Sequence, residues 1–447
     1  MTDDLTRDRQ GEPGPKHFCL QHAANLSTEQ LLDVVQRRSV RYFLDASDPS
    51  SGLAYDRLRL NGSSPNGIIS LGGCGFGFLA ILVAISKGWI TRSDAVARTL
   101  QMLRSLQKID RFHGAFPHFV AHRSLNVRSF SRYDDGGDLV ETGLLLQGLI
   151  CSRSFFTNDD PAERQIRTMI TSLCDSVEWN WYVRSRKRPS LYWHWSPKYG
   201  WKMNMPITGW NEALIVYILA AGSKNFEIPA EAFHSGWTNE GNFLNGQQYY
   251  NTVLPVGVPF GGPLFLSQYS FCCLDPRGLV DSNMNYEQQA RAHSQINYLH
   301  CLHNPNRYTG YGQHGWGLTA CDTPSGYSVN CPATDSGILA PTAALSSFPF
   351  LPAEAGQALR AFLGYKGGAL FKDFGFVDAF RPDGSWEAKT HLAINQGPII
   401  AMIENYRTGS LWSLFMDCQD VQRGLQRLGI TTTTYCGPLN VSTSSAG

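Results

Sequence analysis

The chain has 447 residues, and its 38 Lys and Arg against 37 Asp and Glu give a formal charge of +1. That balance provides no field to attract nucleic acid or an anionic membrane, so the sequence predicts neither as a partner. Charged residues make up only 17% and aromatic residues 12%, which suits an aromatic-lined cleft or, equally, a large aromatic core.

Residues 1–26 are rich in Gly, Pro and charge and are predicted to form a flexible leader. They contain no apolar stretch of the secretory type, so a cytoplasmic protein is expected. No Ser/Gly linker divides the remainder, which predicts a single domain over 27–430 and a flexible tail over 431–447.

The first predicted helix covers about 27–45, where Ser27 and Gln30 are spaced as in a capping box. The uncharged stretch between Arg59 and Lys87 raises the question of a membrane span, but its glycines and serines favour a buried helix. The last helix is expected to break near Gly409. The other helices are predicted at about 73–86, 92–108, 138–155, 161–179, 211–221, 284–303, 336–347, 352–364 and 396–428.

About a dozen helices alternate with long loops from end to end, and strand-like alternation is scarce. This rhythm predicts an all-α fold, a single (α/α)6 toroid in which loops at one rim form a cleft. An α-solenoid is the main rival, but it requires a fixed sequence period, and none is found.

The sequence offers carboxylate chemistry. It lacks zinc-ligand spacing and a nucleophile elbow, so no metal and no cofactor is predicted. The GGCGFG run at 72–77 superficially matches a dinucleotide fingerprint. We expect no strand before it and find no acidic residue at the required distance after it, which argues against that interpretation.

Three acidic residues stand at predicted junctions between a loop and a helix, where a side chain can enter a cleft from a rigid backbone. Asp138 and Glu141 are three apart and share a helix face, although capping of that helix explains them equally well. Glu212 is expected in the first turn of a helix capped by Asn211. Burial against Trp210 would raise its pKa and suit it to general acid chemistry, whereas the helix dipole acts in the opposite direction.

Several motifs resemble the bacterial glucoamylase-like family of (α/α)6 glycoside hydrolases. They are VETGLLLQG at 140–148, GWNEALIVYILAAGS at 209–223, FGFVDAF at 374–380 and NQGPIIAMIENYRTG at 395–409, among others in the same order over about 36–416. The resemblance implies acid/base hydrolysis of β-1,2-glucans or sophorose, with Glu212 as the acid and Asp138 and Glu141 as the acidic pair. The family pattern has a base Asp where this chain has Asn395.

An amide cannot take a proton from water at neutral pH, so Asn395 leaves three hypotheses. In the first, the enzyme inverts the anomeric configuration, and Glu141 or Asp138 serves as a relocated base. In the second, it retains the configuration, with Glu141 as nucleophile and Glu212 as acid and then base, and it hydrolyses or transglycosylates. In the third, the protein only binds glycan. The retaining mechanism is favoured because it needs only two carboxylates.

An oligosaccharide or glucan is the predicted partner, and the oligomeric state is left open. Flat rings suit the C–H faces of sugars, and polar side chains suit hydroxyl groups. The predicted substrate contacts are Tyr55, Arg57, His118, Trp193, Trp195, Trp210, Gln268, Tyr269, Trp316, Asp322, Asn395 and Arg407.

Overall fold

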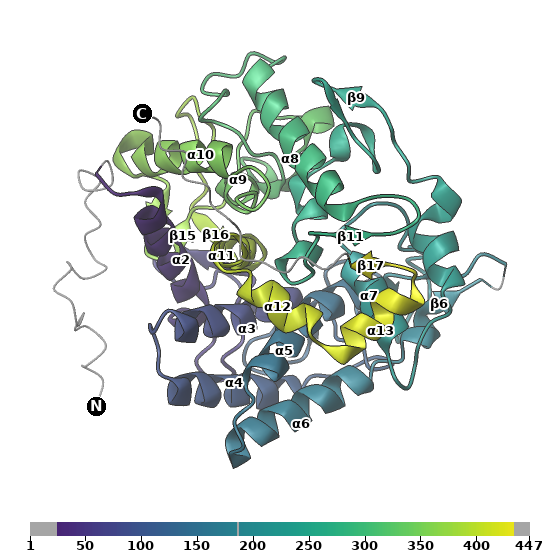
Figure 1. Ribbon diagram of the computed structural model, residues 1–447. Coiled ribbons are helices and arrows are strands. Elements are labelled where there is room, and N and C mark those ends of the chain that lie inside the picture. The colour runs from purple at the N-terminus through teal and green to yellow at the C-terminus, as the bar shows by residue number, and fades with distance from the viewer. Residues whose placement is uncertain (1–24, 186, 433–447) are drawn as a thin grey trace, which may run out of the picture.

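The computed structural model describes residues 25–185 and 187–432 (Figure 1). The predicted leader 1–26 and tail 431–447 therefore lie almost wholly outside the described residues, and the division into leader, domain and tail stays a prediction. Within these ranges no helix is both long and apolar enough to cross a membrane.

Helices that are buried on nearly every side alternate along the chain with helices that bury one face (Figure 1). The former are α3 Leu71–Ser86, α5 Leu139–Phe155, α7 Leu214–Gly222, α9 Pro341–Leu345 and α11 Ala393–Arg407. The latter are α2 Thr28–Leu44, α4 Arg92–Leu106, α6 Pro161–Asp175, α8 Tyr286–His303 and α10 Pro352–Gly364. The short helical turns Leu264–Ser267 and Ser270–Cys272 stand where a further inner helix is expected, between α7 and α8.

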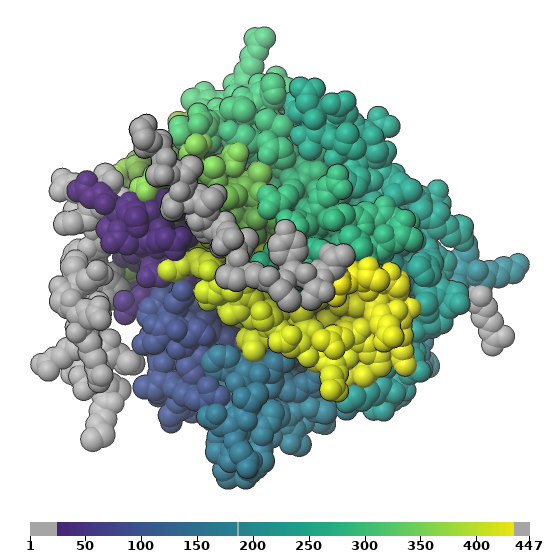
Figure 2. Space-filling model, viewed as in Figure 1, coloured from purple at the N-terminus to yellow at the C-terminus, as the bar shows by residue number. Residues whose placement is uncertain are grey.

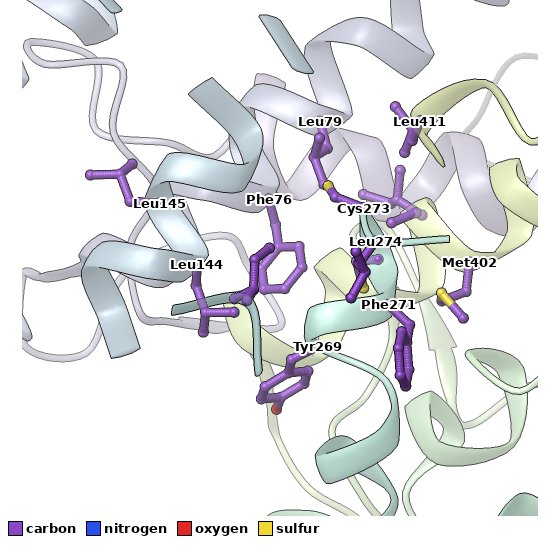
Figure 3. Close-up of a cluster of buried hydrophobic side chains, with 14 of the residues drawn as sticks. Phe76, Leu79, Leu144, Leu145, Tyr269, Phe271, Cys273, Leu274, Met402 and Leu411 are labelled. Carbon is purple, nitrogen blue, oxygen red and sulfur yellow. The ribbon is translucent and has the colours of Figure 1, made fainter. Parts of the chain in front are cut away.

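The inner helices share one core (Figure 3). Phe76 from α3, Leu144 from α5, Phe271 from the helical turns and Met402 from α11 all lie in one buried cluster. The chain closes on itself because α11 packs against both α3 and α2. Two short C-terminal helices, α12 Ser410–Met416 and α13 Gln419–Arg427, then lie across the face shown in Figure 2.

The glycine run at 72–77 serves helix packing. All of it lies inside α3, and a Cβ on Gly75 would meet the carbonyl oxygen of Leu144 at 2.0 Å. A Cβ on Gly148 of α5 would likewise stand 2.1 Å from the carbonyl oxygen of Gly75. The expectation that no strand precedes this run was wrong, since β2 covers Ile68–Ser70. The glycines are nevertheless explained by the close approach of α3 and α5.

Short two- and three-stranded ladders join the loops that precede the inner helices. Strand β2 pairs with β3 Phe119–Ala121, β5 Gly137–Asp138 pairs with β8 His194–Trp195, and β1 Arg57–Arg59 pairs with β16 Thr390–Leu392. Because α3, α5 and α11 each begin at the residue after such a strand, the ladders draw their N-terminal ends to one rim.

The remaining strands extend one of these ladders, as β4 does on β3, or form separate two-stranded pairs. They are β4 Val127–Arg128, β6 Val183–Arg184, β7 Ser190–Leu191, β9 Gln248–Tyr249, β10 Thr252–Val253, β11 Leu279–Val280, β12 Ala320–Thr323, β13 Gly326–Val329, β14 Phe371–Lys372, β15 Gly375–Phe376 and β17 Thr431–Thr432.

The sequence predicted most helix positions, with three corrections. The helix expected over 336–347 is reduced to the five residues of α9. The helix expected from 211 begins only at Leu214, so Glu212 lies in the turn before it. The long C-terminal helix is three helices; the predicted break at Gly409 is confirmed, where φ is 67°, and a second break separates α12 from α13.

Candidate active site

The acidic residues singled out in the sequence lie at the ends of inner helices. Glu141 is in the first turn of α5, Glu212 precedes α7, and Asn395 is in the first turn of α11. Side chains at a helix start stand on a rigid backbone, which holds a reacting group in place better than a free loop does. We describe the site as a His118 cluster, comprising His118, Asp134, Asp138 and Glu141, and an Asn395 cluster, comprising Asn395, Asp378, Asp322 and Arg57.

Asp138 caps α5 and also supports the His118 cluster. Its Oδ1 accepts hydrogen bonds of 2.9 Å from the backbone N–H groups of Val140 and Glu141. Its Oδ2 accepts from Trp193 Nε1 at 3.2 Å and lies 3.2 Å from His118 Nδ1. Both carboxylate oxygens are therefore occupied, and Asp138 fits a positioning role better than that of a base.

His118 is surrounded by carboxylates. Its Nδ1 lies 3.6 Å from Asp134 Oδ2, and its Nε2 lies 3.6 Å from Glu141 Oε1. Burial disfavours a charged imidazole, but the charges of Glu141, Asp134 and Asp138 outweigh it and raise the pKa of His118 well above its usual value. The surrounding carboxylates therefore favour the charged imidazolium form of the ring beside Glu141.

Glu141 is held by donors on both sides. Its Oε2 accepts a 2.7 Å hydrogen bond from the Gly72 N–H at the start of α3. Burial raises the pKa of Glu141 to about 7, while His118 and the Gly72 N–H act against the rise. A Cβ on Gly72 would lie 2.8 Å from this oxygen. Glu141 is therefore fixed in position by the Gly72 N–H and faces the imidazole of His118.

Glu212 has the contrasting environment. Burial raises its pKa to about 7, and the negative charges of Asp138 and Glu141 add to the rise. In the described part of the chain no cationic side chain pairs with it. Ser270 fixes the turn, since its Oγ donates to the Glu212 carbonyl and accepts from the Ile215 N–H. Glu212 consequently keeps its proton to higher pH than an ordinary glutamate.

The Asn395 cluster is closed by hydrogen bonds. Asn395 Nδ2 donates to Asp378 Oδ1 at 2.7 Å, and the Asp322 N–H donates to Asp378 Oδ2 at 2.6 Å. Burial raises the pKa of Asp378 to about 7, and the charge of Asp322 adds to the rise. Arg57 pairs with Asp322, which also accepts from Thr390. Both Asp378 oxygens are thus engaged.

Two residues connect the clusters. The charge of Asp56 acts on both His118 and Glu141, and Asp56 also interacts electrostatically with Arg57 and Asp322. Tyr269 donates to Asn395 Oδ1 at 3.4 Å and lies within the electrostatic influence of Glu212. Because their charges interact, we refer to the two clusters and Glu212 together as the polar centre.

The structure brings six of the predicted substrate contacts to this centre or against its carboxylates: Arg57, His118, Trp193, Tyr269, Asp322 and Asn395. Tyr55 bonds Asp48 and His122, and Trp195 packs on His113 and Trp181. These two stay predictions.

Four other predicted contacts serve the fold. Trp210 and Trp316 are buried, with their indole N–H groups donated to Ser267 and to the Glu354 carbonyl. Gln268 donates to the Ala343 carbonyl. Arg407 pairs with Glu29 and Asp33 at the opposite end of α11 from Asn395. Arg407 as a substrate contact stays a prediction, and in this structure its charge is paired between α11 and α2.

Sequence reasoning missed Asp56, Asp134 and Asp378. Asp378 stands inside the quoted FGFVDAF motif, and Asp56 directly precedes Arg57, so both could have been flagged. Asp134 lies in a loop with no local signal, and only the fold places it beside His118.

The His118 cluster also has the ligand types of a cation site. One atom each from His118, Asp134 and Asp138 lies within 4.8 Å of the others. However, Asp138 already caps a helix and accepts from Trp193, and the imidazolium supplies positive charge. The residues are thus explained by an ion-pair network.

Comparisons with known proteins identify relatives of this chain and its fold. The family model described as Glycoamylase matches residues 204–419. An exo-β-1,2-glucooligosaccharide sophorohydrolase (non-reducing end) of Parabacteroides distasonis is 40% identical over 423 residues. The alignment covers 90% of this chain, which spans only 58% of the length of that relative.

Solved structures match over nearly their whole length. An endo-β-1,2-glucanase from Chitinophaga pinensis, in complex with sophorotriose and glucose, is 42% identical with a TM-score of 0.88, covering 91% of this chain and 99% of that one. A glucoamylase structure from Bacteroides uniformis is 44% identical with a TM-score of 0.88, covering 91% and 98%. The predicted toroid and the family resemblance are confirmed.

Proposed function

This chain belongs to the glucoamylase-like family of (α/α)6 glycoside hydrolases, and from that premise we propose that it cleaves or transfers β-linked glucosyl units of β-1,2-glucans or sophoro-oligosaccharides. The relatives named for β-1,2-glucan and its oligosaccharides support this substrate class. A cytoplasmic place of action stays a prediction.

The observation that carries the mechanism is the unequal surroundings of two glutamates. Glu141 lies beside the His118 imidazole, whereas the charged side chains that act on Glu212, Asp138 and Glu141, are both negative. Environments that separate two carboxyl groups in this way assign one as the base or nucleophile and the other as the acid. Because both pKa values are raised to about 7, the assignment rests on the partner: the cation beside Glu141 favours its ionised form as nucleophile, and Glu212 is the proton donor.

In the first step, a Glu141 carboxylate oxygen attacks the anomeric carbon while the Glu212 proton passes to the leaving glycosidic oxygen. The bond between the anomeric carbon and that oxygen breaks, and a glycosyl ester forms on Glu141. Glu212, now a carboxylate, takes a proton from water or from a sugar hydroxyl. The resulting oxygen nucleophile releases the sugar with retained configuration, by hydrolysis or by transfer.

An inverting mechanism is the second candidate, and one observation favours it. Asp378 is buried with a pKa of about 7 beside Asn395, so it could act as a base in place of the missing Asp. Against this, both Asp378 oxygens already accept hydrogen bonds. Asp138 is disfavoured for the same reason.

Proton NMR of the first sugar released from sophorotriose tests the proposal. We expect the β-anomer to appear first, with transfer products when sophorose is in excess. First appearance of the α-anomer would contradict retention and favour Asp378. If the protein binds sophorotriose but neither releases nor transfers glucosyl units, the proposal fails and the protein is a glycan-binding protein.

The Glu212→Gln variant should lose activity by about 10³-fold. The exposed Glu227→Gln variant is the matched control, since it makes the same chemical change away from the polar centre.

A further inference from the structure

Phe130 is an exposed aromatic ring fixed against the His118 cluster. It is 59% exposed, and its ring stacks on the His118 imidazole with centroids 4.6 Å apart and an interplanar angle of 8°. One face is therefore covered by His118, and the exposed area belongs to the opposite face and the ring edge. Single exposed apolar residues are common, but this one rests directly on a group beside Glu141.

The ring is held by a tight turn. The Phe130 N–H donates to the Asp134 carbonyl at 3.0 Å, and the Asp134 carboxylate lies 3.6 Å from His118 and 3.2 Å from His194. Phe119 packs against the ring at 5.7 Å. The open face is thus presented in a fixed orientation, which lowers the entropy cost of binding a flat partner.

The surroundings fit a sugar better than a protein partner. The sequence neighbours of Phe130, namely Arg128, Ser129, Ser131 and Arg132, are all exposed and polar. A pyranose presents an apolar C–H face and hydroxyl groups at its edge. An isolated ring with hydrogen-bond donors around it matches that pattern.

The spacing places this ring beyond the reacting bond. His118 separates Phe130 from Glu141, with its Nε2 3.6 Å from Glu141 Oε1 and its ring plane parallel to Phe130. A sugar stacked on the open face of Phe130 is therefore not the one attached to Glu141.

We propose that Phe130 is the stacking platform for a neighbouring glucosyl unit of the oligosaccharide. This inference rests on the proposed function, because it names a further subsite of the same substrate.

The test compares Phe130→Leu with Phe130→Trp. Leucine still covers His118 but offers no flat face, whereas tryptophan restores one. In the wild-type enzyme background, we expect Phe130→Leu to raise the KM for sophorotriose about tenfold, with kcat and the KM for sophorose changed less. Phe130→Trp should stay within about twofold of the wild type. Val253→Ala, an exposed residue on the distant β10, is the control.

Two outcomes would overturn the proposal. One is an unchanged KM for sophorotriose in Phe130→Leu. The other is a fall in kcat with the KM unchanged, which would mean that the ring acts only by covering His118.

Direct binding separates this proposal from the proposed function. In a Glu212→Gln background, calorimetry should show that Phe130→Leu lowers the affinity for sophorotriose. Phe130→Trp should restore that affinity. If sophorotriose binds in this Phe130-dependent way but the wild-type protein neither hydrolyses nor transfers, the proposed function fails while the subsite stands. If catalysis is present and binding ignores Phe130, the subsite alone fails.

Discussion

The His118 cluster and the Asn395 cluster both contain buried carboxylates, but these carboxylates have different hydrogen-bond and ion-pair partners. Glu141 has a cation and one backbone N–H as partners, whereas Asp378 has an amide and a backbone N–H that engage both its oxygens. The cation beside Glu141 favours its ionised, nucleophilic form, whereas Asp378 is held at both oxygens by uncharged donors that fix its position. The comparison teaches that burial alone does not make a buried acid reactive.

The largest expected effect is on the reaction rate, and its absence would contradict this comparison of the two clusters. Glu141→Gln should lower kcat/KM by about 10³-fold or more, because it removes the anion that attacks the substrate. Asp378→Asn should cost less than about tenfold, through altered hydrogen bonding. Steady-state kinetics on sophorotriose measures both. If Asp378→Asn lowers kcat/KM as much as Glu141→Gln does, the base belongs to the Asn395 cluster and the result supports an inverting mechanism.

Gly72→Ala tests how tightly Glu141 must be held. The added Cβ would stand 2.8 Å from Glu141 Oε2, and displacing a reacting group by about 1 Å can cost about 10²-fold in rate. We expect a fall in kcat of that order with folding retained, measured by kinetics and thermal denaturation. Gly356→Ala in α10 is the control, since its Cβ meets nothing closer than 3.8 Å. Unchanged kcat in Gly72→Ala would show that this contact is dispensable.

His118→Gln sharpens the electrostatic argument. Removing the imidazolium removes the charge that opposes the rise in the pKa of Glu141, so that pKa should increase. Because Glu141 must be ionised to attack, the rising limb of the kcat/KM profile should move to higher pH, by about one unit. The pH dependence of kcat/KM measures it. A limb that stays in place while activity falls at all pH values would make His118 a binding residue only.

The smallest effect is on stability. Glu141, Glu212 and Asp378 all have folded-state pKa values of about 7, above the usual 4.5 for the two glutamates and 3.8 for the aspartate. The folded protein therefore holds protons that the unfolded chain has lost, so the stability that these groups contribute is present at acid pH and is lost as pH rises through about 7. Thermal denaturation from about pH 5 to 8 should show this decline, and Glu212→Gln should make it shallower. An equally steep decline in Glu212→Gln would contradict the raised pKa of that group.

Much of the fold and part of the site follow from sequence alone. Helix starts were found where a local signal exists, as at the Ser27 capping box, which forms as expected. The break at Gly409 follows from a residue that tolerates positive φ. The acidic residues before α5 and α7 were located from the same junction signals, although Glu212 proved to lie outside its helix.

Only the tertiary structure decided which groups share the site. Asp138 pairs with His194 across β5 and β8, and Arg57 pairs with Leu392 across β1 and β16. Strands of two or three residues carry almost no sequence signal, so these long-range pairings and the partners they bring together could not be predicted. Arg407 is a different case. It was predicted as a substrate contact from its motif, but it lies at the C-terminal end of α11, where it pairs with Glu29 and Asp33. Sequence periodicity determined the helices because helical contacts are local, whereas the ionisation of Glu141 and Glu212 depends on neighbours brought from distant parts of the chain.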